Sequence, residues 1–197
     1  MKELIVATNN ISKIQEVKKI LNNIKIISLE DINLKIEFSE DKKTFEENAI
    51  EKAKKIVNIT KKACIADDSG LCIEYLNDFH GVETKRFLGR EATQEDRNNY
   101  LIKKLNKVIN KEKRKAKMVT CIAFVDNYGN EKVFKGFLEG YISNKRRGKN
   151  GFGFDEIFEI QTGRTLAELS EEEKNKISSR KIALEALKNF LINYTYL

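Results

Sequence analysis

Apolar residues along this chain follow two spacings, one typical of strands and the other typical of helices. Short continuous or alternating apolar runs predict strands at residues 2–7, 25–29, 63–66, 71–75, 118–125 and 132–142. The last two runs flank the polar segment 126–130, which predicts a hairpin with a loop of five residues. Another polar segment, Asp67-Asp68-Ser69-Gly70, separates the runs 63–66 and 71–75 and predicts a turn between two strands.

Helices are predicted where apolar residues recur every three or four positions behind a capping sequence. S-x-x-Q at residues 12–15 and T-x-x-E at residues 44–47 both match the capping box, so a helix is expected to begin at each. A third helix is expected over residues 94–107, and Ser170 caps a further short helix. One face of a C-terminal helix is expected from Ile177, Leu184, Leu187, Leu191 and Tyr194. Alternating strands and helices with one hairpin predict an α/β fold with a mixed sheet.

Composition favours a soluble globular chain, because 41% of its 197 residues are apolar and 34% are charged. This length suits one domain, which two closely fused lobes could form. The opening apolar run is too short for a signal peptide or a membrane span, which predicts a cytoplasmic protein without a membrane partner. The three cysteines form no C-x-x-C pair and are expected to be buried, reduced thiols: Cys64, Cys72 and Cys121.

The net charge of +7 raises the alternative of a nucleic-acid-binding module. Two basic clusters, residues 111–117 and 145–149, contribute to this charge. A solvated face accounts for the first cluster, while the second adjoins a glycine-rich segment and could attract a triphosphate. Because no helix-turn-helix, zinc-finger or RNP-like pattern is present, no nucleic-acid partner is expected.

The loop from Thr8 to Lys13 connects the first predicted strand to the first predicted helix. Free N–H groups and the positive end of a helix dipole favour an anion there, and Lys13 adds a mobile positive charge. The loop lacks the glycines and the G-K-[ST] sequence of a Walker loop. An ordinary strand–turn–helix junction is the alternative interpretation.

The adjacent carboxylates of Asp67 and Asp68 suggest a cation site. Two such groups repel each other unless water or a cation separates them, and Mg²⁺ prefers a few carboxylates together with waters and phosphate oxygens. Glu40, in a second acidic segment, is the candidate for a further metal ligand. An ordinary acidic turn is the alternative.

Segment 148–155 combines glycines with two phenylalanines. Glycine permits close backbone approach, and a phenylalanine ring offers a face on which a base can stack. A glycine loop with core phenylalanines is the alternative. Lys174 and Arg180 place cationic groups near the last predicted helix, where they could bind phosphate or remain surface charges.

Five segments, in this order, resemble the inosine triphosphate pyrophosphatase family, also called the Ham1 family. Residues 7–16 resemble its opening A-T-x-N-x-x-K-x-x-E, residues 44–49 resemble T-F-x-E-N-A, and residues 66–71 resemble its A-D-D-S-G-L segment. Residues 151–158 resemble G-G-F-G-Y-D-P-I-F, and residues 165–180 resemble the family's ending.

This resemblance implies a mixed, elongated sheet flanked by helices, two lobes with a nucleotide cleft between them, a homodimer and dependence on Mg²⁺. It implies hydrolysis of non-canonical purine triphosphates (ITP, dITP, XTP) to monophosphate and pyrophosphate. Asp68 would be general base and metal ligand, Glu40 a second ligand, and Lys13 a catalytic cation. The substrate would contact Thr8, Asn9, Asn10, Ser12, Lys13, Ser69, Phe152, Gly153, Phe154, Asp155, Lys174, Ser179 and Arg180.

One departure from the family pattern bears on substrate choice. Ser179 stands where the family usually has histidine, and a hydroxyl cannot reproduce the reach or charge of an imidazole. The base preference therefore stays open, and a pyrophosphatase of the similarly folded Maf type is the rival enzyme. The single histidine, His80, is expected in a loop, which argues against a Ser–His triad.

Overall fold

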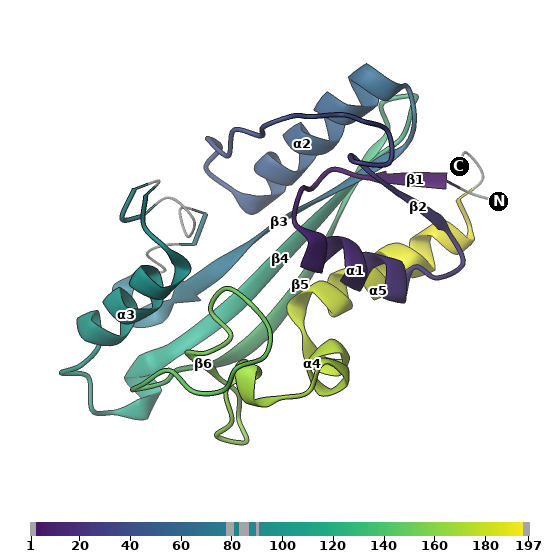
Figure 1. Cartoon of the computed structure of the whole chain (residues 1–197). Coiled ribbons are helices and arrows are strands. Elements are labelled where there is room, and N and C mark those ends of the chain that lie inside the picture. Colours follow the sequence, from purple (N-terminus) through teal and green to yellow (C-terminus); the bar gives the residue numbers. More distant parts are fainter. Residues whose placement is uncertain (1–2, 78–80, 83–86, 90, 195–197) are drawn as a thin grey trace. The chain divides into compact units, whose positions relative to one another are not determined.

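The computed structural model of the chain describes residues 3–77, 81–82, 87–89 and 91–194 (Figure 1). Six strands form one sheet in the order β2-β1-β3-β4-β5-β6. β1 pairs in parallel with β2 and β3, whereas β5 pairs antiparallel with β6, so the sheet is mixed. The strands are β1 (Glu3–Val6), β2 (Lys25–Ser28), β3 (Cys64–Ile73), β4 (Lys115–Val125), β5 (Glu131–Ile142) and β6 (Phe158–Glu159). The predicted α/β fold class is confirmed.

Five α-helices accompany the sheet in the described residues: α1 (Ile11–Ile20), α2 (Phe45–Thr60), α3 (Gln94–Lys104), α4 (Glu171–Ile177) and α5 (Ser179–Ile192). The caps predicted for α2 and α4 are confirmed, because the side chains of Thr44 and Ser170 each accept a bond from a backbone N–H three residues later. None of the helices in this part of the chain is both long and apolar enough to cross a membrane.

The predicted start of α1 is wrong by two residues, and the predicted cap is the wrong residue. Asn10, rather than Ser12, occupies the N-cap position, where its side-chain oxygen accepts a bond from the backbone N–H of Lys13 at 3.2 Å. Asparagine is as good an N-cap as serine, and it comes first along the chain. The helix, with the free backbone N–H groups of its first turn, therefore begins directly after Asn10.

The C-terminal apolar face is divided between two helices. Ser178 has extended backbone angles and separates α4 from α5, so Ile177 lies in α4 and not on the last helix. Leu184, Leu187 and Leu191 are buried on α5, as predicted, whereas Tyr194 follows the end of this helix.

No turn interrupts β3, contrary to the prediction from its polar segment. The strand runs without a break from Cys64 to Ile73, and Asp67 and Asp68 lie inside it. β3 lies between β1 and β4 in the sheet, and both aspartates are buried. A buried carboxylate is tolerated in such a strand only when a cation or hydrogen-bond donors compensate it, and both aspartates have such partners.

The chain divides into two compact units. The first comprises residues 1–69, 120–136 and 179–197, and the second comprises residues 70–119 and 137–178. The expected organisation as one domain with two lobes and a cleft stays a prediction. Each unit has its own apolar core.

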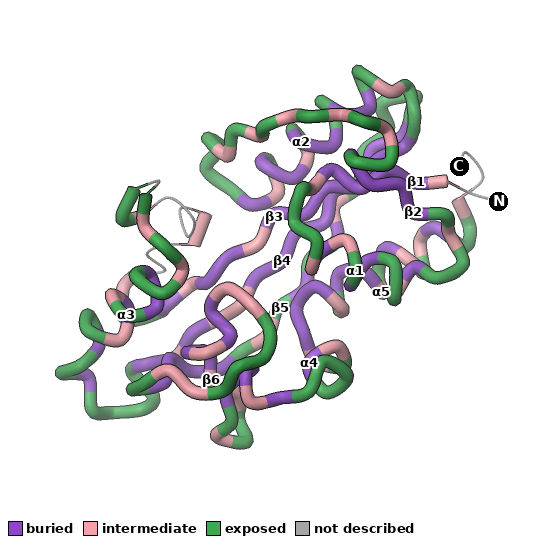
Figure 2. The backbone as a smooth tube through the Cα atoms, viewed as in Figure 1, coloured by how far each residue is buried: buried purple, intermediate pink, exposed green. Residues whose placement is uncertain are grey.

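In the first unit, successive strand residues alternate between two core clusters. Leu4 and Ile65 belong to the cluster that includes apolar residues of α1 and α5, while Ile5 and Ala66 belong to the cluster that includes residues of α2. This alternation is the period of two that a strand imposes on its side chains. Figure 1 accordingly shows α2 on one face of these strands and α1 and α5 on the other, and Figure 2 shows the buried strands between them.

The core of the second unit gathers residues from β3, α3, β5 and the segment before β6. Its buried members include Ile73, Leu101, Ile142, Phe154 and Phe158. The three thiols are free, as predicted, and Cys64 and Cys121 are buried, whereas the expected burial of Cys72 is wrong because this residue is only half-buried. Burial raises the pKa of the Cys64 thiol and raises the pKa of Cys121 to about 12, which keeps both protonated and unreactive.

Candidate active site

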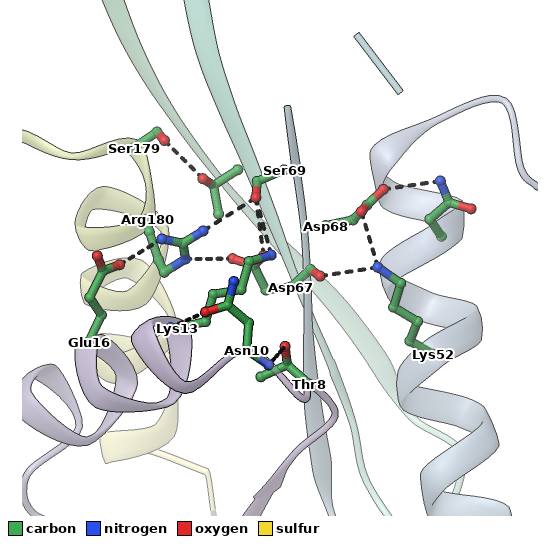
Figure 3. A network of polar contacts seen from close by, with 12 residues as sticks. Thr8, Asn10, Lys13, Glu16, Lys52, Asp67, Asp68, Ser69, Ser179 and Arg180 are labelled. Carbon is green, nitrogen blue, oxygen red and sulfur yellow. Dashed lines mark hydrogen bonds and ion pairs between the residues drawn. The ribbon is translucent and has the colours of Figure 1, made fainter. Parts of the chain in front are cut away.

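The two adjacent aspartates of β3 point to opposite faces of the strand. Asp67 continues the series of Ile65 toward α1 and α5, whereas Asp68 continues the series of Ala66 toward α2. Figure 3 shows the two carboxylates leaving the strand on opposite sides. The pair predicted from sequence is therefore two separate carboxylate sites, one on each face.

Asp67 is the centre of a network on the face toward α1 and α5. Arg180 donates through Nε to Oδ2 of Asp67 at 2.8 Å and through Nη1 to Oε2 of Glu16 at 2.6 Å. Lys13 pairs its ammonium with Oδ1 of Asp67 and contacts Oγ of Ser69 at 3.3 Å. Ser69 also donates to Asp67 at 3.2 Å. We call these five residues the Asp67 cluster (Figure 3).

The Asp67 cluster balances its charges while it is almost fully buried. Lys13 and Arg180 contribute two positive charges, and Glu16 and Asp67 contribute two negative charges, each with less than a tenth of its surface exposed. Buried charges are stable only when they are paired with good geometry. The cluster therefore holds the two cations in fixed positions.

Asp68 is the centre of a smaller network on the face toward α2. Lys52 places its ammonium 3.1 Å from Oδ1 of Asp68 and 2.5 Å from Oε1 of Glu40. The side-chain amide of Asn48 donates to the other oxygen, Oδ2, at 3.0 Å. We call these four residues, Glu40, Asn48, Lys52 and Asp68, the Asp68 cluster. Here two carboxylates share one lysine.

The donor set of the Asp68 cluster fits a hard divalent cation. The carboxylates of Glu40 and Asp68 converge on a single positive group, and oxygen ligands of this kind suit Mg²⁺. In the part of the chain that the structure describes, no group of three or more His, Cys, Asp or Glu residues is arranged to hold a metal ion. Two carboxylates agree with the preference of Mg²⁺ for keeping waters and binding phosphate oxygens.

The loop before α1 presents short polar side chains next to the helix N-terminus. Thr8 accepts a bond from the backbone N–H of Asn10 at 3.2 Å, and Asn10 caps the helix. Asn9 donates to the carbonyl of Ile36 at 3.1 Å and lines a cavity of about 670 Å³ formed mostly by residues 30–37. Ser12 lies in the first turn of α1 and is half-buried.

Ser179, the departure from the family pattern, pairs with another hydroxyl. Its Oγ lies 2.8 Å from Oγ1 of Thr120, and both residues are buried (Figure 3). Ser179 is the first residue of α5, directly before Arg180. The Ser179 hydroxyl is thus hydrogen-bonded to Thr120, directly next to the Asp67 cluster.

The second unit forms its own polar group around the predicted glycine loop. Lys174 pairs with Oδ2 of Asp155 at 2.6 Å, and its ammonium lies 4.3 Å from the centre of the Phe152 ring. The backbone N–H of Phe152 donates to the same oxygen at 2.7 Å. A Cβ at Gly151, where φ is +77°, would lie 2.1 Å from that oxygen, so glycine is required there.

Phe154 and Gly153 are held within the second unit. Phe154 is buried in the core of this unit, whereas Phe152 is only half-buried. Asn98 of α3 donates to the carbonyl of Gly153 at 3.1 Å, which fixes the backbone of the loop. Phe152 is therefore the better candidate for stacking on a base.

The basic clusters are extensively paired with carboxylates. Lys111 and Arg147 each contact Glu159 at 2.6 Å, and Arg146 contacts Glu156 at 2.6 Å. Pairing lowers the net positive charge that these clusters present to a polyanion. This observation weakens the nucleic-acid alternative without testing it.

Four residues of the two clusters were not predicted in these roles from sequence: Glu16, Asn48, Lys52 and Asp67. Asp67 was predicted only as a member of one cation site together with Asp68, not as a site of its own. Asn48 and Lys52 could have been found from spacing. They are four residues apart, and they interrupt the apolar stripe of α2 on its buried side. His80 lies outside the described residues.

Comparison with known proteins identifies the chain's relatives. The family model described as the Ham1 family matches residues 4–190. A dITP/XTP pyrophosphatase from Thermoanaerobacter sp. (strain X514) is 44% identical over 193 residues, 96% of each chain. One from Bacillus subtilis (strain 168) is 41% identical and covers 97% of this chain and 98% of its own.

A solved structure agrees with these sequence matches. A HAM1 protein from Coxiella burnetii superposes with a TM-score of 0.90 at 36% identity, and the match covers 98% of this chain and 100% of that one. Sequence and fold therefore agree along almost the whole length, and the chain belongs to the Ham1 family.

Proposed function

We propose that this chain is a nucleoside triphosphate pyrophosphohydrolase that acts on non-canonical purine nucleotides such as ITP, dITP and XTP. It would release a nucleoside monophosphate and pyrophosphate and so remove these nucleotides from the pool. The observation that carries the proposal is the similarity, over 96% of both chains, to a protein named dITP/XTP pyrophosphatase. The two clusters supply the chemistry that such a reaction needs.

The Asp67 cluster supplies the positive charge for the phosphates. Lys13 and Arg180 are held by Asp67, so their positions are set before a substrate arrives. Charge that develops on phosphate oxygens is stabilised most by such preorganised donors. Thr8, Asn10, Ser12 and the first N–H groups of α1 add hydrogen-bond donors beside Lys13.

The Asp68 cluster supplies the carboxylates for water activation. We assign Asp68 the role of accepting the proton of the attacking water, with Lys52 close by to stabilise negative charge. Glu40 and Asp68 would hold Mg²⁺, which when bound neutralises phosphate charge and polarises the phosphorus that is attacked.

The polar group of the second unit supplies a surface for the base. The ammonium of Lys174 lies over the Phe152 ring, so a purine that stacks on that face would displace the ammonium toward the edge of the base. A 6-keto oxygen accepts a hydrogen bond from such a donor, whereas a 6-amino group cannot. A mismatch of this kind discriminates strongly between substrates, which would disfavour ATP.

A pyrophosphate-release screen tests this proposal. The purified chain would be assayed with ITP, dITP, XTP, ATP and GTP, with Mg²⁺ and with EDTA in its place. We expect release with the first three substrates only when Mg²⁺ is present. No release from any of them would refute the proposal.

The same screen separates the rival enzyme. Adding dUTP and methylated pyrimidine triphosphates to the screen tests for Maf-type activity. An enzyme of that type would release pyrophosphate preferentially from these substrates. A nucleic-acid-binding module would release no pyrophosphate and would bind DNA with steep salt dependence.

We also propose that the protein is a cytoplasmic homodimer, as the family resemblance implies. Light scattering on the purified chain would measure the mass in solution directly. A monomer at micromolar concentration would contradict the dimer and would leave the proposed activity untouched.

A further inference from the structure

We propose that Asn48 is a positioning residue that holds both carboxylates of the proposed metal site, an inference that rests on the proposed function. Asn48 lies on α2 and has no exposed surface. Its amide Nδ2 donates to Oδ2 of Asp68 at 3.0 Å, and its Oδ1 accepts from the backbone N–H of Lys42 at 3.0 Å. One side chain thus joins β3 to the segment before α2.

The second of these bonds fixes the position of Glu40. Residues 34–41 form neither helix nor strand, so the surrounding contacts decide where this segment lies. Lys42 follows Glu40 by two residues, and a bond to its backbone limits how far Glu40 can move from Asp68. An amide suits this place because it offers a donor to the carboxylate and an acceptor to the N–H.

Asn48 can keep this role when a cation is bound. It contacts Oδ2 of Asp68, whereas Lys52 contacts Oδ1 and Glu40. The side of Asp68 toward Glu40 is therefore separate from the side that Asn48 holds. A partner of this kind orients a ligand without competing for the metal.

Two variants separate the two hydrogen bonds. Asn48→Ala removes both, whereas Asn48→Asp keeps an acceptor for the Lys42 N–H and loses the donor to Asp68. We expect kcat for dITP to fall about 10- to 100-fold in both variants, because loss of such supporting bonds has effects of this size. The change in KM should be smaller, since neither variant alters the phosphate-binding Asp67 cluster.

Two measurements without turnover test the positioning itself. In amide exchange followed by NMR, the Lys42 N–H should lose protection at least about tenfold in Asn48→Ala and keep it in Asn48→Asp. In a titration with MgCl₂ alone, followed by backbone shifts, the dissociation constant should rise about 10-fold or more in Asn48→Ala.

Ile56→Val is the matched control on the same helix. Ile56 is fully buried in the core that includes α2, and its side chain has no polar atom, so this change weakens packing and removes no side-chain hydrogen bond of either cluster. We expect it to leave kcat and Mg²⁺ affinity within about twofold. An equal loss of activity in this control would mean that Asn48 serves only stability.

The outcomes distinguish this inference from the proposed function. If the wild-type chain hydrolyses no triphosphate, the proposed function fails. If the wild type is active and Asn48→Ala retains its kcat and its Mg²⁺ affinity, the positioning role alone is overturned.

Discussion

Each face of β3 carries one aspartate, and the two aspartates differ in the charged residues that surround them. On the face toward α1 and α5, Asp67 meets both Lys13 and Arg180, and the charges of its cluster cancel once Glu16 is included. On the face toward α2, Asp68 and Glu40 both contact Lys52, so the four residues of the Asp68 cluster carry two negative charges and one positive charge.

The unequal charge around the two aspartates indicates which carboxylate is available for chemistry. A carboxylate that is neutralised by two buried cations serves to hold those cations, because separating them would expose unpaired buried charge. A pair of carboxylates that shares one cation retains affinity for another positive charge. We therefore propose that Asp67 organises the site and that Asp68 takes part in the reaction.

Asp67→Asn is expected to have the largest effect, and on stability. Within the Asp67 cluster it removes one of the two carboxylates that balance Lys13 and Arg180, and removing one partner of a buried ion pair costs about 3–5 kcal/mol. Urea unfolding at pH 7 measures this loss. A loss below about 1 kcal/mol would place the pair in the class of exposed ion pairs and would contradict the role of Asp67.

Asp68→Asn should separate activity from stability. The amide fills the same space but cannot accept the proton from water, so we expect kcat for dITP to fall at least about 100-fold. Circular dichroism and urea unfolding should show a folded protein that is more stable than Asp67→Asn. Turnover close to wild type would remove Asp68 from the catalytic role.

Lys13→Met tests whether the cations of the Asp67 cluster bind phosphate. The methionine keeps the apolar stem and loses the charge, and a charged hydrogen bond contributes about 1.5–3 kcal/mol. KM for dITP should therefore rise roughly 10- to 100-fold. Steady-state kinetics at several substrate concentrations check this, and an unchanged KM together with an unchanged kcat would exclude the contact.

Asp126 is a reference carboxylate that, among the described residues, is held by hydrogen bonds and not by a cation, and Asp126→Asn removes its charge. Asp126 lies in the hairpin loop, where two backbone N–H groups, the amide of Asn130 and the Tyr194 hydroxyl donate to it. Burial raises the pKa of Asp126, but these hydrogen bonds outweigh it and lower the pKa below its ordinary value of 3.8.

The sign of the pH effect follows from this lowered pKa. A group whose pKa is lower in the folded state stabilises the fold above its unfolded pKa, and that stabilisation is lost as the pH falls through the folded value. Asp126→Asn should therefore cost about 1 kcal/mol at pH 7, and the difference from wild type should shrink below about pH 4. Thermal unfolding at pH 7 and pH 3 measures it. A difference independent of pH would show that charge is not involved.

The fold could largely be predicted from sequence, because apolar spacing reports directly on burial. Strands β1, β2, β4 and β5, their hairpin and the caps at Thr44 and Ser170 were accessible from sequence, whereas β6 was not predicted. Polar residues inside a strand instead suggest an exposed turn. Asp67 to Gly70 resemble a turn, and only their distant partners, such as Arg180 at a separation of 113 residues, explain why the strand continues.

The site could be predicted in part, for a related reason. Lys13 and Asp68 were found from motifs, but the motifs did not indicate which side chains these two residues contact. Lys13 contacts Asp67 and Ser69, whereas the lysine on Asp68 is Lys52 from another helix. Which of two neighbouring aspartates meets which lysine depends on strand parity and helix placement, and local sequence does not report either.

Strand parity also sets which changes in length β3 can accept. Adding or removing one residue between Ala63 and Asp67 would exchange the faces of the two aspartates. Each aspartate would then point toward the residues that now contact the other one. Adding two residues would restore the faces but shift the acids along the strand. The number of residues in β3 is therefore constrained as tightly as its two aspartates, and natural insertions should collect in loops.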